Sequence, residues 1–144
     1  MNNGTLAYIF NTNFLYNSAS NGSAIYADNY NATNNYIEIK GSTFAYNITT
    51  NGSTIRPNID VVLVDTKFIQ NVATRAILDA HVNFSMDNVL FQGNIVTDNQ
   101  KIGLTGDASM TIRNSDFIGN YANGVNRPGA LRTTSNKTVS LIEM

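Results

Sequence analysis

The chain has 144 residues, of which 42% are hydrophobic and 13% charged, and its formal net charge is -1. This length fits one domain of residues 1–144, and the hydrophobic fraction is enough for a packed core, which excludes a wholly disordered chain. No basic cluster suits nucleic acid, no apolar run reaches the roughly 20 residues of a membrane helix, and the absence of cysteine excludes disulfides and thiolate metal sites.

Asparagine is dense along the entire chain. It is a poor helix former that favours turns and left-handed backbone conformations. The sequence therefore predicts short strands joined by asparagine corners rather than long helices.

The first repeat begins with Ala7 and Ile9, two apolar residues at alternate positions that predict a strand with one buried face. Asn11 follows as a turn former, residues 14–17 read Phe-Leu-Tyr-Asn, and Ile25 ends the unit. The same order then returns four times, with a Phe-to-Phe spacing of roughly 23 to 30 residues that is typical of solenoids. The motif Phe-x-x-Asn occurs at Phe14–Asn17, Phe44–Asn47, Phe68–Asn71, Phe91–Asn94 and Phe117–Asn120.

The repeats stay in register on both sides of this motif. The longest interval contains residues 28–35, which are interpreted as a loop bulging from the stack. Three residues before each Phe stands a turn former: Asn11, Gly41, Asp65, Asn88 or Asn114. Five residues before it stands an apolar residue: Ile9, Ile39, Leu63, Met86 or Ile112. A second apolar column follows each Asn: Ile25, Ile55, Ile77, Leu104 and Leu131.

Stacking explains why each position repeats, because parallel strands lie about 4.8 Å apart and equivalent residues sit above one another. The five Phe would form a buried column worth about 10 kcal/mol as an upper bound, and the five Asn a hydrogen-bonded ladder at a corner. We expect an all-β fold, a single-stranded parallel β-helix of about five coils. We expect a right-handed coil, because connections between parallel strands are nearly always right-handed. The alternative is a β-sandwich with Asn-Gly hairpins, which gives no reason for the register.

The repeat resembles that of the polymorphic outer membrane proteins, bacterial autotransporter adhesins in which Phe-x-x-Asn is followed by Gly-Gly-Ala-Ile. Residues 22–25 read Gly-Ser-Ala-Ile, residues 52–55 Gly-Ser-Thr-Ile and residues 128–131 Pro-Gly-Ala-Leu. Only Ala-Ile remains at residues 76–77 and only Gly-Leu at 103–104. The resemblance implies a right-handed β-helix with a role in surface adhesion.

No catalytic, metal or cofactor site is predicted. Hydrolysis of a glycosidic bond needs two carboxylates about 5 to 9.5 Å apart, but Asp65, Asp87 and Asp116 occupy different repeat positions. His81 is the only histidine and lacks a fixed carboxylate partner, so we interpret it as structural. Among the Asn-x-Ser/Thr sequons, Asn31 on the predicted loop is the best candidate for N-glycosylation.

Apolar residues also stand at outward positions of the predicted strands. Tyr8, Phe10, Val62 and Val64 are apolar where the alternation places solvent, which favours either cover by loops or a partner surface. Asp87 and Arg113 are expected to be stacked neighbours. Together with the resemblance, which implies surface adhesion, the outward apolar residues favour a non-catalytic adhesion module on a cell surface or outside the cell, with a carbohydrate-active β-helix as the alternative.

The expected partner of this module is a protein or glycan on another surface, without nucleic acid and without membrane insertion by these residues. We also expect a segment of a longer repeat protein, or association of copies end to end or side by side.

Overall fold

The computed structural model describes residues 6–27, 35–80, 83–97, 104–106, 109–123, 131–133 and 139–142. Within these ranges every regular element is a β-strand, and the strands form four parallel sheets. Sheet A contains β1 (Leu6–Phe10), β5 (Tyr36–Lys40), β9 (Asp60–Val64), β13 (Phe84–Asp87), β17 (Met110–Arg113) and β21 (Val139–Ile142). Sheet B contains β2 (Asn13–Leu15), β6 (Thr43–Ala45), β10 (Lys67–Ile69), β14 (Leu90–Gln92) and β18 (Asp116–Ile118).

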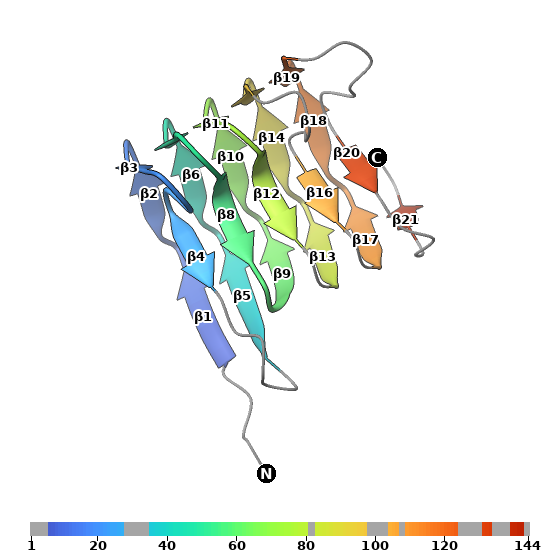
Figure 1. Ribbon diagram of the computed structural model, residues 1–144. Helices are drawn as coiled ribbons and strands as arrows, with labels where there is room; N and C mark the ends of the chain where they lie inside the picture. The colour runs from blue at the N-terminus through green and yellow to red at the C-terminus, as the bar shows by residue number, and fades with distance from the viewer. Residues whose placement is uncertain are drawn as a thin grey trace.

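The other two sheets complete each coil. Sheet C contains β3 (Ser18–Ala19), β7 (Ile48–Thr49), β11 (Val72–Ala73), β15 (Ile95–Val96) and β19 (Tyr121–Ala122). Sheet D contains β4 (Ile25–Ala27), β8 (Ser53–Pro57), β12 (Ala76–Ala80), β16 (Leu104–Gly106) and β20 (Leu131–Thr133). Successive strands along the chain thus belong to sheets A, B, C and D in turn, and each coil pairs with the next (Figure 1).

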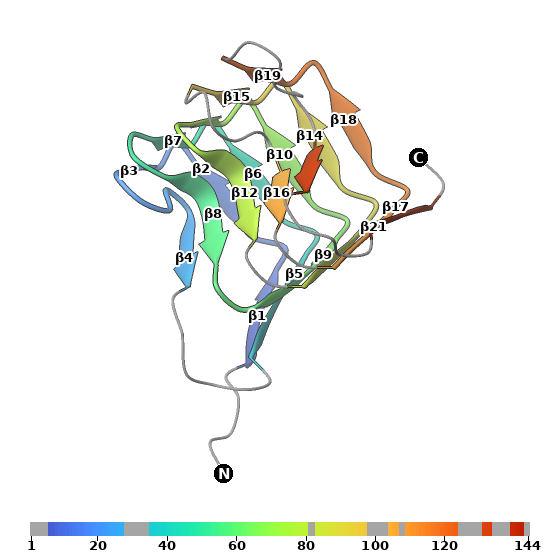
Figure 2. The ribbon, with the colours of Figure 1, turned by 45° about the vertical axis from the view of Figure 1, so that its right-hand side comes forward.

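The architecture is a right-handed parallel β-helix, which confirms the fold predicted from the repeat. The coils advance from the blue N-terminal strands to the red C-terminal ones, and the two views show one solenoid whose cross-section is bounded by the four sheets (Figures 1 and 2). All the strand pairs in the described residues are parallel, for example β1 with β5 and β10 with β14, so the antiparallel sandwich is wrong. From Phe14 to Phe117 the chain completes four turns, because the five Phe are register partners one coil apart.

The Phe of sheet B form a single stack through the interior. Successive ring centroids lie 4.7, 5.0, 4.5 and 5.1 Å apart, with the ring planes within 9° of parallel. Phe44, Phe68 and Phe91 are fully buried, whereas Phe14 and Phe117 at the two ends are half-buried. Inward residues of sheet A, such as Ile39 and Leu63, complete the core.

The Asn that follow the Phe form a hydrogen-bonded ladder at the corner between sheets B and C. The Oδ1 of Asn71 accepts hydrogen bonds from the backbone N–H and the Nδ2 of Asn47, at 3.1 and 2.9 Å. Its Nδ2 donates to the Oδ1 of Asn94 at 3.0 Å and to the carbonyl of Phe44 at 2.8 Å. The amide thus uses all four of its hydrogen-bonding positions while fully buried. The same bonds recur in the neighbouring rungs.

Both corners that flank sheet B need a left-handed residue. At the corner between sheets A and B, the turn formers Asn11, Gly41, Asp65, Asn88 and Asn114 have φ between 46° and 61°. The corner before each ladder Asn has φ between 49° and 62°, at Tyr16, Tyr46, Gln70, Gly93 and Gly119. A left-handed conformation costs a non-glycine residue roughly 1–2 kcal/mol, so the two tyrosines there are unusual.

The second apolar column differs by one residue from the predicted one. Leu78, not Ile77, is the register partner of Ile55 and Leu104. The segment between Asn71 and β12 sets this register, and spacing from the motif does not reveal it. Both side chains are fully buried.

Candidate functional site

The outer face of sheet A carries large apolar side chains in solvent at its first coil. Leu6, Tyr8 and Phe10 project outward from β1 and are half exposed. The rings of Tyr8 and Phe10 lie 5.8 Å apart with planes tilted by 49°. Apolar and aromatic side chains therefore cover the outer face at the first coil.

Tyr36 of the second coil joins these rings, although the sequence pattern did not single it out. Its ring meets Tyr8 edge-on at 5.8 Å, and the two hydroxyls are hydrogen-bonded at 2.8 Å. This hydrogen bond, with smaller effects of partial burial and of the neighbouring Tyr8 and Glu38, raises the pKa of Tyr36 from 10.0 to about 12. Tyr36 is the register partner of Leu6, so the same alternation that selects Tyr8 could have found it.

The second pair of predicted surface residues lies apart from the first. Tyr8 and Val62 occupy the same outward row, but Glu38 of β5 stands between them in the register. In the next row Lys40 separates Phe10 from Val64 in the same way. The structure thus divides the four residues into two pairs, with charged side chains between them. Tyr8 and Phe10 form an aromatic cluster with Tyr36, and Val62 and Val64 form a valine pair.

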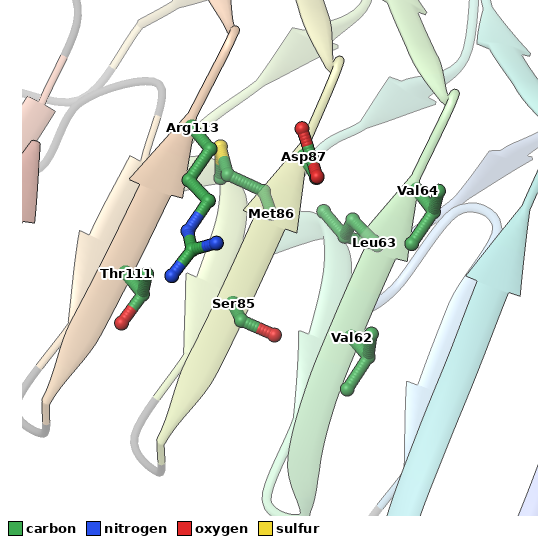
Figure 3. A pocket seen from close by; sticks show the side chains of 8 residues that line it. All are labelled: Val62, Leu63, Val64, Ser85, Met86, Asp87, Thr111 and Arg113. Carbon is green, nitrogen blue, oxygen red and sulfur yellow. The ribbon is translucent and has the colours of Figure 1, made fainter. Parts of the chain in front are cut away.

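The valine pair forms one end of a shallow hollow of about 310 Å³ on the outer face. Small side chains create it: Val62, Ser85 and Thr111 follow one another across β9, β13 and β17. Val64, Asp87 and Arg113 form the parallel row beside them, as Figure 3 shows. A second hollow of about 270 Å³ continues on the other side of the small row, toward Asp60, Asn83 and Ser109.

The two charged side chains of the hollow, Asp87 and Arg113, differ in their contacts with the next coil. Asp87 and Arg113 are register partners, as expected for stacked neighbours. However, the Asp87 carboxylate accepts a hydrogen bond from the Nδ2 of Asn114 at 2.8 Å, and in Figure 3 the Arg113 side chain extends toward Thr111 instead. One coil earlier, the Asp65 carboxylate accepts the same bond from Asn88 at 2.7 Å. The exposed Arg113 guanidinium is therefore available to a ligand.

Two residues singled out from the sequence, Asn31 and His81, lie outside the described residues. In the part of the chain that the structure describes, no three His, Cys, Asp or Glu side chains gather as a metal site would require. Nor do the described segments include a helix able to span a lipid bilayer.

Comparison of the chain with protein-family models, with curated proteins and with solved structures gave no match.

Proposed function

We propose that the chain is a non-catalytic adhesion module that acts outside the cell or on its surface and binds a partner through the outer face of sheet A. The observation that carries the proposal is the placement of half-exposed Tyr8 and Phe10 on the same sheet face as a polar-lined hollow. The resemblance of Phe-x-x-Asn to the repeat of autotransporter adhesins supports the same role. When a partner covers exposed apolar groups on a sheet face, it removes them from water, and this favours binding.

The shape of this face favours a slender ligand. The described strands of sheet A have at most five residues of about 3.3 Å each, so the face is roughly 16 Å wide across the axis of the stack. A chain-like ligand can follow the two rows of the hollow along that axis.

The lining favours a glycan among such ligands. The hydroxyls of Ser85 and Thr111, the carboxylate of Asp87 and the guanidinium of Arg113 offer both donors and acceptors within one hollow. The valines and the aromatic cluster offer apolar surface on which the C–H faces of sugar rings can pack. We therefore propose a glycan on another surface as the partner.

Binding to an array of surface glycans and to intact cells tests the proposal. The double variant Tyr8→Ser/Phe10→Ser and the variant Arg113→Ala should each weaken binding at least about tenfold, because each loses more than about 1.4 kcal/mol of contact energy. Ile48→Ser/Ile95→Ser on sheet C provides the matched control, since both residues are similarly exposed on another face. This control should bind as the parent does.

Other results would contradict parts of the proposal. Binding that survives enzymatic removal of cell-surface glycans but not protease treatment would identify a protein partner. Shortened glycans after incubation would favour the alternative, a carbohydrate-active β-helix. Binding that changes equally in the face and control variants would remove sheet A from the function. Sedimentation at several concentrations would show whether copies associate end to end or side by side.

A further inference from the structure

A different feature of the molecule is a pair of tyrosines at the corner before the Asn ladder. Tyr16 and Tyr46 hold the same position in the first and second coils, with φ of 57° and 58°. Their backbone N–H groups donate to the carbonyls of Ala45 and Ile69 at 3.1 and 3.0 Å, so the strand ladder itself holds the corners. Bulky side chains rarely adopt this conformation, and Gly93 and Gly119 occupy the same position in later coils.

The corner geometry places the two phenol rings in direct contact and in solvent. The ring centroids lie 4.9 Å apart, and the ring planes are within 6° of parallel. Tyr16 is 72% exposed and Tyr46 is 41% exposed, so small reagents reach both rings. An unusual backbone conformation that presents two exposed, reactive groups together indicates a use for the pair.

We propose that Tyr16 and Tyr46 form a site of oxidative cross-linking, at which dityrosine joins the first coil to the second. The required oxidant is a peroxidase that uses hydrogen peroxide. It removes one electron and one proton from each phenol, which leaves two phenoxyl radicals. A bond then forms between one ring carbon ortho to oxygen in each residue, and each displaced hydrogen returns to the oxygen of its own ring. In total the protein loses two hydrogen atoms, and one hydrogen peroxide becomes two waters.

Contact between the rings favours this intramolecular coupling over coupling between molecules, because the second radical is already held beside the first. The product would close the chain between residues 16 and 46 in a protein that has no cysteine. Such a cross-link restricts the unfolded chain in the way a disulfide does.

The other close tyrosine pair serves as a comparison within the same molecule. Tyr8 and Tyr36 meet edge-on, and their oxygens face each other at 2.8 Å. Each hydroxyl is engaged by the other, and the edge-on contact does not lay one ring over the other. This pair therefore couples more slowly than the stacked pair at the corner.

The experiment treats the full chain, at a concentration too low for intermolecular coupling, with horseradish peroxidase and hydrogen peroxide. The monomer should gain dityrosine fluorescence and lose the mass of two hydrogens, and tandem mass spectrometry of peptides should place the bond between residues 16 and 46. Tyr16→Phe and Tyr46→Phe retain the stacked ring and should each lower the yield at least tenfold. Tyr121→Phe is the matched control, because Tyr121 is 59% exposed on sheet C, and it should leave the yield unchanged.

A second readout is thermal melting. The oxidised parent should melt several degrees higher than the untreated parent, and oxidised Tyr16→Phe should melt where untreated Tyr16→Phe does. The proposal is overturned if dityrosine appears only in dimers, maps to residues 8 and 36, or forms equally in Tyr16→Phe.

Discussion

The interior of the coil and the outer face of sheet A follow opposite rules. Inside, Phe lies on Phe and Asn on Asn from coil to coil, and the inward positions of sheet A stay apolar. Outside, one outward row of sheet A changes at each step: Phe10, Lys40, Val64, Asp87, Arg113. A buried side chain touches its own equivalents above and below, so a change in one coil disturbs two neighbours. An outward side chain chiefly meets water or a partner, and it is free to differ.

Removing an interior ring should have the largest effect on stability. Phe68 is fully buried between Phe44 and Phe91. Phe68→Ala should lower the free energy of unfolding by about 3–5 kcal/mol, since both stacking contacts are lost and a cavity remains. Phe14→Ala should cost less, because Phe14 is half-buried and stacks on one described neighbour. Equal losses for the two variants in denaturant unfolding would show that the depth of burial does not set what each ring contributes.

The ladder should come next. Asn71→Ala removes an amide that makes four buried hydrogen bonds. It should lower the free energy of unfolding by roughly 1–3 kcal/mol, because the partner groups stay buried and no water replaces the lost bonds. Asn17→Ala is the matched control at an exposed rung and should cost less. Melting curves of Asn71→Ala that overlay the parent would mean that the ladder contributes nothing to stability.

The left-handed corner should show a smaller, opposite pair of effects. Gln70 has φ of 49°, and Gln70→Val should cost about 1–2 kcal/mol because a β-branched side chain clashes in this conformation. Gln70→Gly should be neutral or stabilising, since Gly93 and Gly119 hold the same position. Chemical denaturation measures both, and a Val variant as stable as the Gly variant would show that the corner is not under strain.

On the outer face, a substitution should barely affect stability. Ser85→Ala removes a partly exposed hydroxyl in the hollow, and the free energy of unfolding should change by less than about 0.5 kcal/mol. A loss comparable to that of Asn71→Ala, measured by the same denaturation, would mean that the outward row containing Ser85 contributes to stability.

The smallest effect should appear in an alkaline titration. The hydrogen bond with Tyr8 raises the pKa of Tyr36 from 10.0 to about 12, so the protonated phenol is favoured in the folded state. Its contribution to stability is present below pH 10 and is lost as the pH rises toward about 12. Tyr8→Phe should return the pKa of Tyr36 toward 10, and ultraviolet absorbance follows this ionisation. The same ionisation in parent and variant would contradict the role of the hydrogen bond.

The sequence by itself determined the stack. Spacing identified the Phe and Asn positions and the turn formers of the first corner, because burial against an identical neighbour forces the same residue type to return at each coil. Composition also indicated short strands rather than long helices, since asparagine is dense throughout.

Only the tertiary structure decided how the coils meet. The register of sheet D made Leu78 the partner of Ile55, because the length of the connection after Asn71 sets that register. The pairing of β1 with β5, and of β5 with β9, placed charged residues between the aromatic cluster and the valine pair. It also brought Tyr8 to Tyr36, which stand two positions apart in the repeat. Repeat spacing makes Tyr16 and Tyr46 equivalent, but the structure shows that their rings stack in solvent. Repeat spacing tells which residues are equivalent, but contacts between neighbouring side chains depend on where each coil lies on the next.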